Sequence, residues 1–152
     1  MGDITVFIDS NVILEHLKGS VDLATLRATH NLHINSIVIS EVLYVYLKAI
    51  TGLKSYQLKK KVDEILKRKK ELQELFLFFE AFEILDITNE INQLALNLII
   101  KNGLLPNDAL ILATCKLNGI THLLSFDEDF INPCKKENIT LIKTFVDLEL
   151  IK

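Results

Sequence analysis

The stretch LLPNDALILATCKLNGITHLLSFDEDF, residues 104–130, decides the fold because a helix, a turn and a strand follow one another directly. Pro106 is typical of the first turn of a helix, and Gly119 is typical of the position just after one ends. Residues 121–126 then form a short apolar run that predicts a buried strand. A helix followed at once by a buried strand is the repeating unit of α/β domains.

The rest of the chain repeats this alternation of strands and helices. Strands are predicted at residues 3–8, 32–34, 83–87, 121–126 and 140–142, and helices at 10–18, 21–30, 36–50, 55–80, 88–102, 106–118 and 144–151. Because helices separate successive strands, we expect a three-layer α/β/α sandwich with a mostly parallel central sheet. No repeat or linker divides the chain, so residues 1–152 are expected to form one domain.

Two of the predicted helices are rich in apolar residues. The helix at residues 36–50 is apolar nearly all round, which predicts that it is mostly buried. Residues 55–80 have helical periodicity and end in a cluster of phenylalanines. We expect these phenylalanines to pack in the core, with a role in a partner interface as the alternative. The clustered residues are Phe76, Phe78, Phe79 and Phe82.

The composition excludes several classes of protein. With 49% hydrophobic residues and a mean hydropathy of +0.29, the chain is not expected to be disordered. No apolar run is long enough to span a membrane. The N-terminus lacks a basic n-region and a small-residue cleavage site, so a secretory signal is not expected. The two cysteines, Cys115 and Cys134, have no spacing typical of disulfides or metal sites, so a cytoplasmic location is expected.

Charge is unevenly distributed along the chain. The net charge is −3, but residues 54–74 contain eight Lys and Arg residues and four acids. This local excess of positive charge could attract phosphates. The alternative is a solvated helix with pairs such as Asp63–Lys67 and Glu64–Arg68, and we expect that to hold for most of these charges.

Four carboxylates, Asp9, Glu41, Asp108 and Asp127, lie beside or inside apolar runs. Burying a carboxylate alone is costly. Because the carboxyl ends of parallel strands meet at one edge of a sheet, Asp9 and Asp127 should lie together there, near the helix start at Asp108. Oxygen ligands suit hard divalent ions, so the four acids predict a Mg²⁺ or Mn²⁺ site.

Each acid also has an ordinary structural explanation. Asp9 can cap the helix that follows it, Asp108 is favoured in a first helical turn, and Asp127 is common in turns. Glu41 is the hardest to explain in this way, because apolar residues surround it on its helix and no cation lies within four positions. The metal site is therefore favoured by the four acids jointly rather than by any one of them.

The segments FIDSNVIL (7–14), SIVISEVLY (36–44) and 104–130, in this order, resemble the PIN-domain ribonucleases, and most closely the VapC-type toxins. This resemblance covers nearly the whole chain. It implies an α/β/α sandwich, commonly a homodimer, that cleaves single-stranded RNA with Mg²⁺ or Mn²⁺. It also implies a small antitoxin protein as partner.

The resemblance assigns roles to particular residues. The family's metal-binding acids correspond to Asp9, Glu41, Asp108 and Asp127, with Asp129 at a further acidic position. Asn11 and Ser125 correspond to polar positions that support the carboxylates, although many members have Thr in place of Ser125. With RNA as substrate, the candidates for phosphate contact in the basic segment are Lys59, Lys60, Lys67 and Arg68.

The expected function is thus a metal-dependent endoribonuclease, the toxin of a toxin–antitoxin pair. A phosphomonoesterase with a nucleophilic Asp is disfavoured because Asn11 stands where a second Asp is needed, and a two-component receiver lacks its adjacent acids. The alternative from another class is a non-catalytic RNA- or protein-binding module with the same fold. The complete acid set argues against that module.

Overall fold

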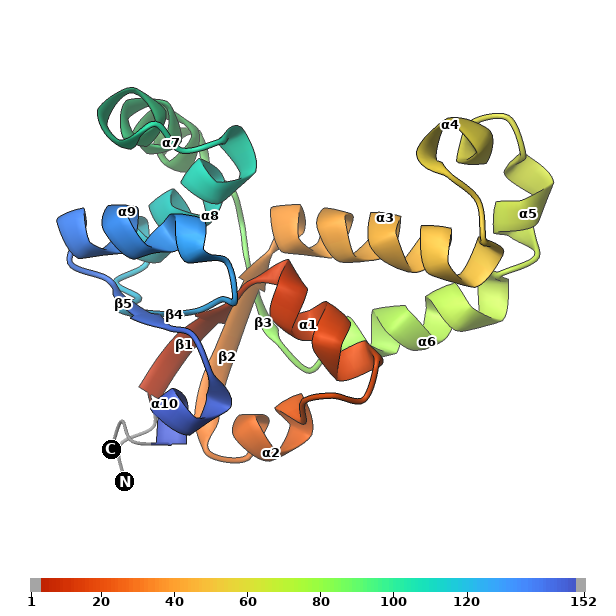
Figure 1. Ribbon diagram of the computed structural model, residues 1–152, viewed down its shortest axis with the longest axis horizontal. Helices are drawn as coiled ribbons and strands as arrows, with labels where there is room; N and C mark the ends of the chain where they lie inside the picture. Colours follow the sequence, from red (N-terminus) through yellow and green to blue (C-terminus); the bar gives the residue numbers. More distant parts are fainter. Residues whose placement is uncertain (1–3, 150–152) are drawn as a thin grey trace.

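A five-stranded parallel sheet forms the centre of the molecule in the computed structural model, which describes residues 4–149 (Figure 1). The strand order is β3-β2-β1-β4-β5. The strands are β1 (Ile4–Ile8), β2 (His30–Asn35), β3 (Glu83–Leu85), β4 (His122–Leu124) and β5 (Thr140–Ile142). All four strand pairs are parallel, which confirms the predicted sheet.

Helices connect the strands and cover the sheet. They are α1 (Ser10–Leu17), α2 (Leu23–Arg27), α3 (Ser36–Thr51), α4 (Ser55–Leu58), α5 (Val62–Leu66), α6 (Lys69–Phe79), α7 (Asn89–Asn102), α8 (Pro106–Leu117), α9 (Ile131–Lys136) and α10 (Phe145–Glu149), with a short 3-10 helix η1 (Glu128–Phe130). The strands lie between α7, α8 and α9 on one side and α1 and α2 on the other (Figure 1). This layering confirms the predicted α/β sandwich. The last residues of the helix predicted at 144–151 lie outside the described part.

The central strand β1 fixes the position of the site. Val6, Phe7 and Ile8 are completely buried, because β2 and β4 flank this strand and helices cover it. On one side β1 pairs with β2, the next strand in the chain, and on the other side it pairs with β4, which comes much later in the chain. The carboxyl ends of β1 and β4 therefore form a switch point of the sheet, where sites in α/β proteins usually lie.

The prediction that the helix at 36–50 is mostly buried was wrong. Only Val38 and Val42 of α3 are fully buried, while Tyr44 is 44% exposed and Val45 is 39% exposed. The reason is geometric: a helix of this length spans about 24 Å and extends beyond the sheet. Together with α4, α5 and α6, the distal part of α3 forms a helical arm, residues 43–77 (Figure 1).

The single helix predicted at residues 55–80 is three helices, α4, α5 and α6. The breaks fall in the Lys-rich runs: Lys61 and Arg68 precede α5 and α6 with non-helical backbone angles. Adjacent like charges repel, and these runs offer no continuous apolar stripe to bury. The predicted ion pairs Asp63–Lys67 and Glu64–Arg68 were wrong, because each of them runs past the end of α5. The ion pairs found are Glu64–Lys67 and Arg68–Glu71.

The phenylalanine cluster divides between the core and the surface. Phe79 and Phe82 are buried and Phe78 packs against them, as predicted for core residues. Phe76 is 60% exposed, so its predicted core role was wrong, because it lies on the outer side of the amphipathic α6. Within residues 4–149, no helix is both long enough and apolar enough to cross a bilayer.

Candidate functional site

Asp9 directly follows β1 and caps α1, and the residue is only 5% exposed. Its Oδ1 accepts a hydrogen bond from the Ser10 backbone N–H at 2.7 Å. Its Oδ2 accepts one from the Ser125 hydroxyl at 2.6 Å. Asp9 therefore does cap α1, but only one of its oxygens serves the cap; the other accepts from Ser125, which directly follows the neighbouring strand β4.

Asn11 and Ser125 connect the segments that follow β1 and β4, and their predicted role in supporting the carboxylates stays a prediction. The Asn11 Oδ1 accepts a hydrogen bond from the Phe126 N–H at 3.2 Å, and its Nδ2 donates to the Ser125 Oγ at 3.4 Å. The same Oγ accepts from the Asp127 N–H at 3.1 Å. This network fixes the loop that carries Asp127, whose Oδ1 accepts from the Asp129 N–H at 2.9 Å.

Glu41 and Asp108 reach the same edge of the sheet from two helices. Glu41 lies in the second turn of α3, which begins directly after β2, and Asp108 lies in the first turn of α8. The side chains of Asn107 and Ser10 lie near the Glu41 carboxyl group. Both acids are partly buried. The four predicted acids therefore come from four segments that meet at the switch point.

The pKa values show that these acids influence one another. Burial is the largest cause that raises the pKa of Asp108 to about 7, and Asp9 and Asp127 add to the rise. Glu41 and Asp129 contribute further to it. Charges interact in this way only over short distances, so the five acids form one electrostatic cluster.

Asp9 and Glu41 are shifted in the same direction. Burial raises the pKa of Asp9 and the Asp127 charge adds to it, against hydrogen bonds that lower it. Burial also raises the pKa of Glu41, with the Asp9 charge as the second cause. A site that disfavours negative charge on several neighbouring carboxyls is one that a cation would stabilise.

The donor atoms of the site have the chemistry of the metal that the acids imply. All donors are carboxylate oxygens, which suit Mg²⁺ and Mn²⁺ and suit softer metals poorly. Within residues 4–149, however, no three His, Cys, Asp or Glu side chains stand close enough together to hold an ion as they are placed. Sharing one ion would require the carboxylates to rotate toward one another. The ligand assignment therefore stays a prediction.

Two supporting residues were missed from the sequence. The Asn35 side chain caps α3 by accepting from the Val38 N–H, and its Nδ2 donates to the Thr114 Oγ1 at 2.9 Å. Both residues are completely buried, and this bond holds α3 against α8. It thereby sets the spacing between Glu41 and Asp108. Asn35 stands directly before the helix predicted to start at residue 36, so its position marked it as a possible capping residue. No sequence signal marked Thr114.

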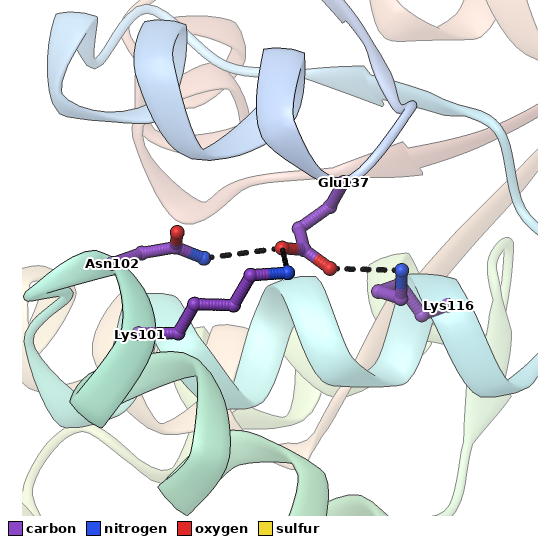
Figure 2. Close-up of polar contacts among 4 residues, drawn as sticks. All are labelled: Lys101, Asn102, Lys116 and Glu137. Carbon is purple, nitrogen blue, oxygen red and sulfur yellow. Dashed lines mark hydrogen bonds and ion pairs between the residues drawn. The ribbon is translucent and has the colours of Figure 1, made fainter.

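Glu137 forms a second polar cluster that the sequence did not predict (Figure 2). Its buried carboxylate accepts hydrogen bonds from Lys116 at 2.9 Å, Lys101 at 3.0 Å and the Asn102 Nδ2 at 3.4 Å. Hydrogen bonds, with Lys116 as the leading cause, lower the pKa of Glu137 to about 2. This Glu137 cluster ties the end of α9 to α7 and α8.

The candidate RNA-contacting residues do not lie at the acidic site. Lys59, Lys60 and Lys67 are exposed on the helical arm, and Arg68 is partly exposed there. Glu41 lies near the start of α3, whereas α4 and α5, which carry or precede these residues, lie beyond the far end of α3 (Figure 1). Any contact they make with RNA is therefore remote from the carboxylates.

Comparisons with known proteins agree with this geometry. The PIN-domain family model matches residues 6–136, which is most of the chain. The chain belongs to the PIN-domain family. It is 44% identical over 130 residues to Ribonuclease VapC2 of Methanocaldococcus jannaschii, covering 82% of this chain and 86% of that protein. It is 32% identical over 142 residues to Ribonuclease VapC6 of the same organism, covering 86% and 93%.

A solved structure confirms the fold of this PIN domain. The chain resembles a chain in the crystal structure of VapBC2 from Rickettsia felis bound to a promoter DNA fragment, with a TM-score of 0.61 and 18% identity. The match covers 91% of this chain and 98% of the other. At this identity the similarity concerns the architecture alone.

Proposed function

We propose that this PIN-domain protein is a divalent-metal-dependent endoribonuclease that cleaves single-stranded RNA. The observation that carries the proposal is the meeting of Asp9, Glu41, Asp108 and Asp127 at the switch point of the sheet. Burial and neighbouring carboxylates raise the pKa values of Asp9, Glu41 and Asp108 there. Its two relatives from Methanocaldococcus jannaschii are named ribonucleases. The alternative, a non-catalytic binding module, offers no reason for gathering so many buried and partly buried acids together.

The four acids have separate roles in the proposed mechanism. Asp9, Glu41 and Asp108 would hold the principal Mg²⁺ or Mn²⁺ ion, while Asp127, with Asp129, would hold a second ion or orient water. When bound, a divalent ion polarises the scissile phosphate and acidifies the attacking water. Attack by water in line with the leaving oxygen gives a 5′-phosphate and a 3′-hydroxyl.

Hydrogen bonds prepare these carboxylates for their roles. The Ser125 hydroxyl and the Ser10 N–H each occupy one lone pair of Asp9, which fixes the carboxylate plane and leaves the remaining lone pairs available. Asp108 must lose its proton before it can act as a ligand. With its pKa at about 7, that loss occurs near neutral pH.

We infer that an antitoxin partner binds the helical arm. The matched structure from Rickettsia felis is a VapBC complex, and this arm exposes an unusual number of large apolar side chains. These are Tyr44, Val45, Tyr56, Val62, Leu66, Phe76 and Leu77, which are between 39% and 67% exposed. The homodimer implied by the resemblance stays a prediction.

The basic residues of the arm are proposed to contact RNA outside the catalytic centre. Lys59 and Lys60 make no ion pair among the described residues, whereas Lys67 and Arg68 are paired with acids of the arm. The unpaired lysines are therefore the stronger candidates for phosphate contacts. A single-stranded RNA would have to extend along α3 to reach both regions.

An end-labelled RNA assay tests the proposed function. The protein is incubated with single-stranded RNA and Mn²⁺, with and without EDTA, and the new termini are identified. We expect cleavage that EDTA abolishes, giving 5′-phosphate and 3′-hydroxyl ends. Cleavage that survives EDTA, or products with 2′,3′-cyclic phosphates, would show that a metal-free mechanism operates instead.

A further inference from the structure

Four lysines lie around the carboxylate of Glu137, in the last turns of α7, α8 and α9. Lys101 and Lys116 donate hydrogen bonds to this carboxylate from α7 and α8, at 3.0 Å and 2.9 Å (Figure 2). Lys135 and Lys136 directly precede Glu137 on α9 and are exposed. Neither of these two makes an ion pair within residues 4–149. The four lysines together form what we call the basic patch.

The positive charge of the basic patch is not balanced locally. Its four ammonium groups surround one carboxylate, although the whole chain has a net charge of −3. A helix end carries about half a negative charge, which favours a lysine in the last turn, but three such ends and Glu137 do not offset four lysines.

Glu137 fixes two of these lysines in place. It is buried, and hydrogen bonds, led by the one from Lys116, lower its pKa to about 2, so the carboxylate is ionised near neutral pH. Each ammonium group has three N–H donors, and Glu137 uses one from Lys101 and one from Lys116. The side chain of Lys101 is still 63% exposed, so its other donors are available to an anion.

A pocket connects the basic patch with the acidic site. Asp108 and Asp129 of the acidic site line this pocket, and so do Asn102 and Asn132. Asn102 directly follows Lys101 and donates to Glu137 at 3.4 Å. Asn132 lies one helical turn before Lys136, about 6 Å along α9, and residues four apart share a helix face. The basic patch therefore lies directly beside the pocket, whereas the lysines of the helical arm lie beyond the far end of α3 (Figure 1).

We propose that the basic patch binds backbone phosphates of the RNA strand on one side of the scissile bond, an inference that rests on the proposed ribonuclease function. The clustered carboxylates repel a polyanion except where a cation neutralises them, so the strand needs a positive surface close by. Lysines hold phosphates as point charges and do not read bases, so this contact positions the strand whatever its sequence. Because Glu137 already orders Lys101 and Lys116, their binding to phosphate costs less side-chain entropy.

The test measures binding of a labelled oligouridine at several salt concentrations, in an Asp9→Asn background where cleavage is not expected. Changing both Lys135 and Lys136 to Gln should reduce the slope of log affinity against log salt by about 1.4, at about 0.7 for each phosphate contact on a single strand. The matched control changes Lys18 and Arg27 to Gln. It removes two exposed positive charges at α1 and α2, on the other side of the sheet, and should keep the slope (Figure 1).

Cleavage kinetics give a second readout in the protein with Asp9 intact. Changing Lys135 and Lys136 to Gln should raise KM for oligouridine and leave kcat unchanged, because a phosphate contact away from the scissile bond is equally strong in the ground state and the transition state. Circular dichroism should show that the variant is folded, since both lysines are exposed.

Two outcomes would overturn the inference. An unchanged salt slope and RNA affinity in the Lys135 and Lys136 variant, with normal cleavage, would exclude the basic patch from RNA binding while leaving the ribonuclease function intact. Weaker binding of polyglutamate with unchanged RNA binding would assign the patch to an acidic protein segment instead. If the wild type cleaves no RNA, the proposed function fails, and the salt slope still decides separately whether the patch contacts RNA.

Discussion

Replacing Asp108 by Asn should stabilise the metal-free protein, and more so as the pH rises. The pKa of Asp108 is about 7 in the folded protein, against an ordinary value of 3.8, so the fold favours its protonated form. The unfolded chain loses this proton near pH 4, whereas the folded protein keeps it to about pH 7. Stability contributed by the neutral form is therefore present below pH 4 and is lost as the pH rises through 7.

The size of the effect follows from the shift. A rise of about three pKa units corresponds to a ceiling of roughly 4 kcal/mol, at about 1.4 kcal/mol per unit. Because Asp108 is only partly buried, solvent screening should reduce this to about 1–3 kcal/mol. For a chain of this length the Tm of Asp108→Asn at pH 8 should exceed the wild-type Tm by about 3–10 °C.

Thermal unfolding in EDTA, followed by circular dichroism from pH 4 to pH 8, measures this difference. The gap between Asp108→Asn and wild type should be small at pH 4 and widen toward pH 8. Asp86→Asn, which changes an exposed acid after β3, serves as the matched control and should follow the wild type throughout. Parallel curves for Asp108→Asn and wild type over the whole range would refute the electrostatic cluster.

Four further results are expected. Mn²⁺ should raise the wild-type Tm, by the equivalent of about 2.7 kcal/mol at a hundred times its Kd, and Asp108→Asn should reduce this shift; an unchanged wild-type melting curve in millimolar Mn²⁺ would contradict the site. Changing Lys59 and Lys60 to Gln should flatten the salt dependence of RNA affinity without changing Mn²⁺ binding, as measured by titration at several salt concentrations. Glu137→Gln should destabilise the protein by up to about 3 kcal/mol at pH 7, as measured by chemical denaturation. This loss of stability should fade below pH 4, because the hydrogen bonds that lower the pKa of Glu137 stabilise only its ionised form. Cys115→Ser should leave RNA cleavage nearly unchanged, since this thiol is completely buried in the core and its pKa is raised by burial.

The sheet and the position of the acids could be predicted because their signals are local. A buried strand followed by a carboxylate identifies Asp9 and Asp127, and Pro106 marks the helix start that carries Asp108. Parallel topology then brings strand ends to one edge without any knowledge of side-chain contacts. The helix predicted at residues 88–102 also rested on local signals, and in the structure Thr88 and Gly103 cap the two ends of α7.

The missed features depend on contacts between distant parts of the chain. Asn35 and Thr114 are 79 positions apart, and nothing in either segment indicates the other. Glu137 gathers groups from α7 and α8, so its role is invisible until those helices are packed. The burial of the helix at residues 36–50 was mispredicted because an apolar helix surface indicates that something covers it but does not identify what.

Cleavage of single-stranded RNA by matched Asp→Asn variants is the measurement that tests the proposed metal site most directly. Wild type, Asp9→Asn and Asp22→Asn are compared with Mn²⁺, after circular dichroism has shown that all three are folded. Asp22 caps α2 near the opposite edge of the sheet, and Asn retains a capping oxygen there. We predict that Asp9→Asn loses activity by orders of magnitude while Asp22→Asn keeps it. Wild-type activity in Asp9→Asn would contradict the proposed role of these carboxylates.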